Sequence, residues 1–123
     1  MPSKTCNSIL VVEDDKDIRD SLTMVLEMEG YNVVAVTNGQ EAIEELECLR
    51  HPCLILLDLM MPVMNGWEFL KARDANDVML TIPVVVVSAV SDSAIRRPKS
   101  ATEFIKKPVE LSLLLQTVKQ YCG

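Results

Sequence analysis

Short apolar runs rich in β-branched residues constrain the fold of this chain most strongly. Five such runs, at residues 8–12, 31–36, 53–57, 83–87 and 103–106, alternate with segments of helical period. A run without polar alternation is typical of a strand buried on both faces, as in a parallel sheet covered by helices. Strands and helices that alternate through 123 residues therefore predict an α/β domain with right-handed crossovers.

Capping residues and prolines predict the helix boundaries. The residues that mark helix starts or stops are Asp15, Gly30, Asn38, Pro52 and Asn65. A last helix is expected after Pro108, with a buried stripe of Leu111, Leu114, Leu115 and Val118. Between residues 91 and 100, Pro98 leaves room only for a short or irregular fourth helix.

Composition excludes several classes of protein. With 18 acidic and 12 basic residues the formal charge is −6, which argues against a nucleic-acid surface. No apolar run approaches the roughly 18 residues that span a bilayer, and the first residues lack the apolar stretch of a secretory signal. We expect a cytoplasmic protein that contacts neither membrane nor nucleic acid directly, with one domain over residues 1–123 and an ordered core over about 8–121.

Polar side chains follow four of the five runs, at the point where each run ends. They are Glu13, Asp14 and Asp15 after the first run, Asp58 after the third, Ser88 after the fourth and Lys107 after the fifth. Because parallel strands end at a common edge, we expect these groups to converge. Carboxylate oxygens suit Mg²⁺, which also accepts phosphate oxygens, and a lysine nearby can meet another phosphate oxygen. The pattern predicts metal-assisted phosphoryl chemistry centred on an aspartate.

Each member of this set also has a simpler structural interpretation. Asp15 at a helix start is better explained as a cap than as a ligand. Ser88 alone fits a strand terminator, and Lys107 alone fits a solvated charge. Asp58 is harder to explain in this way, because a carboxylate at the end of a buried strand needs a partner. The constellation is therefore more specific than any single residue.

Four segments make the chain resemble the receiver domain of two-component response regulators, of the chemotaxis-regulator type. They are Ile-Leu-Val-Val-Glu-Asp-Asp at 9–15, Leu-Leu-Asp-Leu-Met-Met-Pro-Val-Met-Asn-Gly at 56–66, Val-Val-Ser-Ala at 86–89 and Phe-Ile-Lys-Lys-Pro at 104–108. The resemblance implies a doubly wound, flavodoxin-like sheet of five parallel strands in the order 2-1-3-4-5, with helices on both faces. It also implies a phosphorylated signalling switch rather than an enzyme, which catalyses only its own phosphorylation and slow dephosphorylation.

The resemblance assigns a metal and phosphorylation site. Asp58 matches the phospho-accepting aspartate, and Asp14 matches the direct Mg²⁺ ligand, with Mn²⁺ as an acceptable substitute. Glu13 would act on the metal through water, and the Met60 carbonyl oxygen would be a backbone ligand. No organic cofactor is implied.

The resemblance further assigns a switch and partners. Ser88 and Phe104 match the two switch positions, and Lys107 matches the phosphate-contacting lysine, followed by a peptide bond to Pro108 that is usually cis in the family. The implied phosphoryl donor is a sensor histidine kinase or a phosphotransfer protein. The output would pass to an unidentified protein target or output domain, through a monomer or a weak phosphorylation-dependent dimer.

Three other functions fit the sequence less well. An aspartate-nucleophile phosphohydrolase on a similar sheet typically carries a second aspartate two residues after the nucleophile, where this chain has Met60. A dinucleotide-binding fold needs a glycine-rich loop after the first strand, and a flavin-binding module needs one rich in serine, threonine and glycine. This chain instead places four acidic residues between Glu13 and Asp17, which would repel a phosphate.

The four cysteines are too few for a disulfide framework. Cys48, His51 and Cys53 are close in sequence, but three ligands without a second pair nearby are a weak zinc motif. We therefore expect thiols that are not bonded to one another, with Cys6 and Cys122 incidental.

Met60 and Val90 stand where family members set the hydrolysis rate of the acyl phosphate. Both side chains are apolar and cannot orient an attacking water. We therefore predict a phosphorylated state that lives longer than in receivers with acidic or amide groups at these positions. The decay of the phosphorylated chain, followed by intact mass, checks this prediction, and a half-life of seconds would contradict it.

Overall fold

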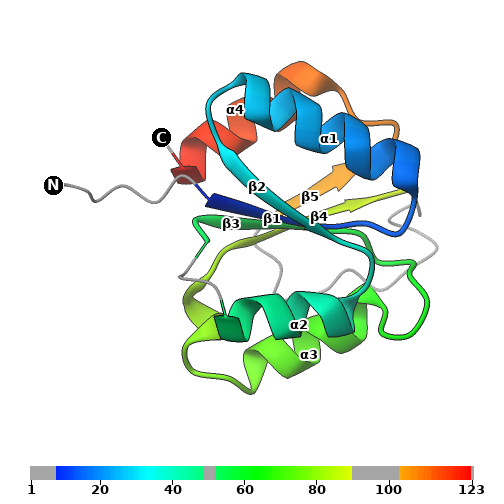
Figure 1. Cartoon of the computed structure of the whole chain (residues 1–123), viewed down its shortest axis with the longest axis vertical. Helices are drawn as coiled ribbons and strands as arrows, with labels where there is room; N and C mark the ends of the chain where they lie inside the picture. Colours follow the sequence, from blue (N-terminus) through cyan, green and yellow to red (C-terminus); the bar gives the residue numbers. More distant parts are fainter. Residues whose placement is uncertain (1–7, 49–51, 90–102, 123) are drawn as a thin grey trace, which may run out of the picture.

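The computed structural model describes residues 8–48, 52–89 and 103–122, which form one parallel sheet between helices (Figure 1). The strands are β1 (Ser8–Val12), β2 (Asn32–Val36), β3 (Leu54–Leu57), β4 (Val84–Ser88) and β5 (Glu103–Lys106). They pair in the order β2-β1-β3-β4-β5, and every pairing is parallel. The predicted doubly wound sheet, with strand order 2-1-3-4-5, is confirmed.

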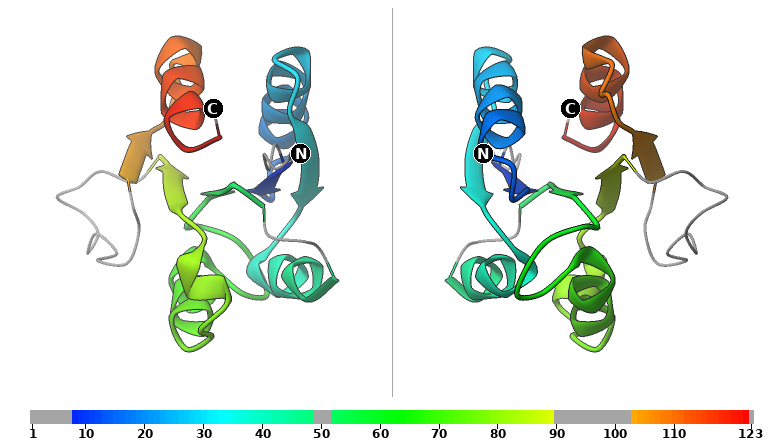
Figure 2. Two further views of the ribbon diagram at one scale, coloured as in Figure 1. Left: turned by 90° about the vertical axis from the view of Figure 1, so that its left-hand side faces the viewer. Right: turned by 90° about the vertical axis from the view of Figure 1, so that its right-hand side faces the viewer.

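Helices cover both faces of this sheet. Figure 2 shows α1 (Lys16–Met28) and α4 (Leu111–Cys122) on one face, and α2 (Gly39–Cys48) and α3 (Gly66–Asp74) on the other. A short 3₁₀ helix, η1 (Met79–Thr81), leads into β4. The predicted short fourth helix at 91–100 lies outside the described residues. Among the residues that are described, no helix combines the length and apolarity needed to cross a membrane.

The three central strands supply the core of both layers. Alternate residues point to opposite faces of a strand, so Ile9 and Val11 join the cluster under α1 and α4, while Leu10 and Val12 join the cluster over α2 and α3. All residues of β3 and β4 are buried, as the unbroken apolar runs predict. The prediction of burial on both faces is wrong for β2 and β5, where Asn32 and Lys106 are exposed. The reason is that these two strands lie at the edges of the sheet, where each has only one neighbouring strand.

The predicted helix caps are present. The Asp15 side chain accepts a hydrogen bond from the Ile18 N–H, and Gly30 follows the end of α1 with a φ of +94°. Asn65 caps α3 and forms a reciprocal capping box with Glu68. These local signals position the first turns of α1 and α3, which adjoin the ends of β1 and β3.

The predicted buried stripe of the last helix is only partly correct. Leu114 and Val118 are fully buried, but Leu111 is 49% exposed. Leu111 is the first residue of α4 and lines an open pocket beside α1.

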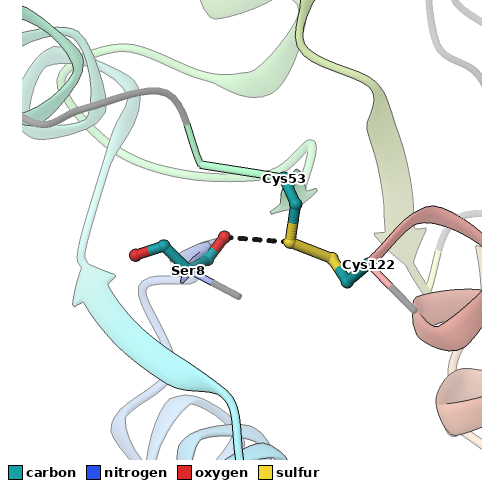
Figure 3. The surroundings of a disulfide bond; sticks show 3 residues. All are labelled: Ser8, Cys53 and Cys122. Carbon is teal, nitrogen blue, oxygen red and sulfur yellow. Dashed lines mark hydrogen bonds between the residues drawn. A yellow bond between two sulfur atoms is a disulfide. The ribbon is translucent and has the colours of Figure 1, made fainter. Parts of the chain in front are cut away.

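The cysteine prediction is wrong for one pair, because Cys53 and Cys122 form a disulfide (Figure 3). The sheet brings the start of β3 beside the end of α4, although the two residues are 69 apart in the sequence. Such a pairing is set by tertiary structure and is invisible to sequence spacing. Of the weak zinc motif, His51 and the side chain of Cys48 lie outside the described residues, and Cys53 is in the disulfide.

Candidate functional site

Three carboxylates meet where β1 and β3 end. One oxygen from each of Glu13, Asp14 and Asp58 lies within 4.8 Å of the others. Glu13 and Asp58 are 2% and 6% exposed, whereas Asp14 is exposed to solvent. The predicted convergence of residues from separate strands is therefore seen in the structure, and the cluster offers both buried and open oxygen atoms.

Backbone hydrogen bonds beyond the strand ends hold two of these residues in place. The Asp58 N–H donates to the Val12 carbonyl at 2.9 Å, and the Glu13 N–H donates to the Val36 carbonyl at 3.0 Å. The hydrogen-bonding pattern of the parallel strands thus continues one residue beyond β1 and β3. Both carboxylates are therefore held at the ends of rigid strands rather than in loops. Rigid support of this kind keeps functional groups at fixed separations.

A glycine lets α3 approach the strand end closely. The Gly66 N–H donates to the Leu59 carbonyl at 3.0 Å, and a Cβ on Gly66 would lie 2.7 Å from the Asp58 carbonyl oxygen. A side chain at this position would displace the backbone that carries Asp58. Local packing therefore explains the glycine that ends the 56–66 segment.

Lys107 supplies the positive charge of the site. Its Nζ lies 2.7 Å from Glu13 Oε1 and 3.8 Å from Asp58 Oδ1. The Lys107 N–H donates to the Ser88 carbonyl at 2.8 Å, and the Lys107–Pro108 peptide bond is cis, as in the family pattern. One ammonium group therefore contacts two buried carboxylates from different strands.

Burial gives Asp58 an unusual affinity for protons. Loss of solvent and the neighbouring Glu13 charge raise the pKa of Asp58 from 3.8 to about 7, although Lys107 and the Met60 N–H favour the ionised form. Near neutral pH this carboxylate lies in a site where negative charge is only partly compensated. A cation beside Asp58 would offset that excess.

The donor set fits a hard divalent cation. Mg²⁺ prefers oxygen ligands, binds through one or two carboxylates and retains several waters. Asp14 is open to solvent, and Asp58 faces the same cluster, so a hydrated ion fits between them. The geometry therefore agrees with the acidic pocket expected from the sequence.

The structure also places most of the other residues predicted for the site. Ser88 is fully buried at the end of β4, and Phe104 on β5 packs against the core over α2 and α3. Met60 is 58% exposed, and its N–H lies 3.4 Å from Asp58 Oδ1. Asp15 caps α1 and is not part of the carboxylate cluster, as its simpler interpretation predicts. Val90 lies outside the described residues.

Arg19, which was not predicted from the sequence, connects the loop that carries Glu13 and Asp14 to α1. Its Nη1 donates to the Glu13 carbonyl at 3.0 Å and to the Asp14 carbonyl at 3.3 Å. A cation in the first turns of a helix opposes the helix dipole, and this conflict is the signal that could have revealed it. Arg19 therefore orients the backbone of two acidic residues without itself lying among the carboxylates.

Replacement of Asp58 by asparagine should stabilise the metal-free protein, and more so at higher pH. The folded-state pKa of Asp58 exceeds the unfolded value, so the ionised carboxylate costs stability progressively from about pH 4 to about pH 7. We expect Asp58→Asn to raise the free energy of unfolding by on the order of 2 kcal/mol at pH 8, and by less at pH 5.

Thermal and urea unfolding in EDTA at both pH values measures this effect. Asp77→Asn changes an exposed carboxylate and serves as the matched control, with little expected change. If Asp58→Asn raised the free energy of unfolding equally at both pH values, or more at pH 5, the raised pKa of Asp58 would be contradicted.

Comparison with known proteins identifies a family. The model of the response regulator receiver domain matches residues 9–119. The transcriptional regulatory protein CrdR of Helicobacter pylori is 35% identical over 92% of this chain and 54% of its own length. The response regulator RR06 of Streptococcus pneumoniae is 36% identical over 91% of this chain and 51% of its own length. The chain thus spans about half the length of these relatives.

Solved structures agree with this result. The chemotaxis response regulator CheY4 of Vibrio cholerae has a TM-score of 0.85 at 29% identity, over 95% of this chain and 99% of its own. The response regulator TrrA of Thermotoga maritima, solved with Mg²⁺ and beryllium fluoride, has a TM-score of 0.81 at 28% identity, over 94% of this chain and 98% of its own. These comparisons give no support to the phosphohydrolase alternative. The matched family model, the shared strand order and the acidic cluster show together that this chain belongs to the response regulator receiver domain family.

Proposed function

We propose that this chain accepts a phosphoryl group on Asp58 with the help of a divalent cation. The observation that carries the proposal is the placement of Asp58. Its carboxylate leaves a buried strand, belongs to a cluster with Glu13 and Asp14, and lies 3.8 Å from the Lys107 ammonium. A nucleophile beside both a cation site and a fixed positive charge suits phosphoryl transfer, in which positioning and charge stabilisation supply most of the catalysis.

Each residue of the site has its own role in this transfer. One carboxylate oxygen of Asp58 attacks the phosphorus in line, while the bond between phosphorus and the donor nitrogen of a phosphohistidine breaks. Lys107 neutralises charge on the phosphoryl oxygens, for which it must exchange part of its contact with Glu13. Asp14 and Asp58 would hold Mg²⁺ directly, Glu13 through water and Met60 through its carbonyl oxygen. Bound there, Mg²⁺, or Mn²⁺ in its place, would supply positive charge that offsets the negative charge of the carboxylate and phosphoryl groups.

The proposed output is a packing change that begins at Ser88. A phosphoryl group on Asp58 adds acceptor oxygens at the strand edge, toward which the Ser88 hydroxyl can turn. Phe104 lies two residues back on the neighbouring strand, since Val86 pairs with Phe104 and Ser88 pairs with Lys106. Movement of Ser88 would free space that Phe104 can occupy, which changes the surface beside β5. The chain then acts as a switch and not as an enzyme on other substrates.

The structure also offers a surface for the phosphoryl donor. A largely apolar pocket of about 540 Å³ lies between α1 and the segment from Lys107 to Leu111 that leads into α4. Its apolar lining comprises Ile18, Leu22, Ala89, Pro108, Val109 and Leu111. We assign this cavity to a histidine kinase or phosphotransfer protein, because a partner seated there would lie beside the phosphoryl-accepting edge.

Incubation with acetyl phosphate and Mg²⁺ tests the central proposal. The wild-type chain should gain the mass of one phosphoryl group, and Asp58→Asn should gain none. Asp77→Asn removes an exposed carboxylate and should be phosphorylated like the wild type. Equal phosphorylation of the wild type and Asp58→Asn, or none in the wild type, would contradict the assignment of Asp58.

A charge in the cavity should block the protein donor without affecting the small one. Leu111 lines the cavity and is 49% exposed, so Leu111→Glu should fold normally and react with acetyl phosphate. Its phosphorylation by a phosphotransfer protein that is active on the wild type should fall about tenfold or more, because a buried charge opposes docking.

Leu113→Glu is the matched control, since Leu113 is 46% exposed on the same helix and does not line the cavity. This variant should accept phosphate from both donors at wild-type rates. Equal losses in the two variants would assign the effect to α4 in general and would overturn the docking proposal.

A further inference from the structure

Cys53 and Cys122 lie far from the phosphorylation site. Cys53 directly precedes β3, Cys122 ends α4, and their Cα atoms are 5.5 Å apart (Figure 3). Asp58 follows the other end of β3, so the disulfide and Asp58 are separated by roughly 16 Å of extended chain. The disulfide therefore links α4 to the sheet at the N-terminal end of β3, and the carboxylates lie at the C-terminal ends of the strands.

The surroundings of Cys53 suit both redox states of its sulfur. The Cys53 N–H donates to the Ser8 carbonyl oxygen at 2.8 Å, and the Cys53 Sγ lies 3.2 Å from the same oxygen. In the disulfide this sulfur carries no hydrogen. After reduction the two sulfurs must move apart to van der Waals contact, and the Cys53 thiol then has a hydrogen-bond acceptor nearby in the Ser8 carbonyl oxygen.

Cys122 is likewise suited to both states. It is 7% exposed and belongs to the apolar cluster under α1 and α4. A buried thiol behaves as a small apolar side chain, so reduction leaves no unsatisfied polar group in this core. Cys53 is only half-buried, which makes it the more accessible partner for a reagent from solution.

We propose that Cys53 and Cys122 form a reversible thiol–disulfide site that clamps the end of α4 to the sheet. The oxidant is a low-molecular-weight disulfide. The Cys53 thiolate attacks one sulfur of this disulfide, forms a mixed disulfide and releases one small thiol. The Cys122 thiolate then attacks the Cys53 sulfur and releases the second small thiol. The pair loses two electrons and two protons, and the small disulfide gains both.

The disulfide affects how firmly the end of α4 is held against the sheet, and it leaves the carboxylate site unchanged. The disulfide closes a loop between residues 69 apart and restricts the unfolded chain, which stabilises the folded state. Amide exchange in α4 reports the same effect locally, because a tethered helix end opens less often. The oxidised and reduced chains should therefore differ in how firmly α4 is held, with the same site at Asp58.

Equilibration of the folded chain in glutathione buffers of graded redox ratio tests the proposal. After an acid quench and alkylation, peptide mass mapping should show a Cys53–Cys122 link that forms and disappears reversibly across the series. Oxidation should raise the melting temperature by roughly 10–15 °C and slow amide exchange in α4.

Variants separate this pair from the other thiols. The double variant Cys6→Ser/Cys48→Ser retains only the proposed pair and should titrate as the wild type does. Cys53→Ser and Cys122→Ala, which leaves no polar group in the apolar cluster, should each lose the redox dependence of the melting temperature.

Three results would overturn the proposal, and each is measured on the wild-type chain even where a variant fails to fold. They are no Cys53–Cys122 link in the most oxidising buffer, a link that glutathione cannot reduce in the folded protein, and a melting temperature that is independent of the link.

Discussion

The buried contact between Lys107 and two carboxylates is the interaction on which the site depends. Glu13 and Asp58 are almost fully buried, and two negative charges so close together would not stay ionised in an apolar core. Lys107 lies 2.7 Å from one and 3.8 Å from the other, so a single ammonium group holds both. The compensation is incomplete, because the pKa of Asp58 is still raised to about 7. A divalent cation would offset this residual negative charge, and that neutralisation supports the proposed phosphoryl transfer to Asp58.

The parallel sheet makes this contact possible. Glu13, Asp58 and Lys107 each follow a different strand, and the strand order places β1 and β3 side by side with β4 and β5 next to them. Backbone hydrogen bonds fix the strand ends, since the Asp58 N–H donates to the Val12 carbonyl and the Gly66 N–H donates to the Leu59 carbonyl. The chemistry of the site thus follows from strand order, and the helices add the supports that orient its loops.

Most of this arrangement could be predicted from the sequence, because its signals are local. Unbroken apolar runs indicate central parallel strands, polar residues after those runs indicate the edge where ligands bind, and Asp15 and Asn65 indicate helix starts. What could not be predicted depends on tertiary position. The exposure of β2 follows from its place at the sheet edge, the Arg19 contact depends on how a long side chain folds back, and the Cys53–Cys122 bond joins residues 69 apart.

Anomalous scattering from crystals of the wild-type protein grown with Mn²⁺ tests the central claim most directly. We expect one manganese peak bound by the carboxylates of Asp14 and Asp58. No peak at saturating Mn²⁺, or a peak that none of the three clustered carboxylates coordinates, would contradict it.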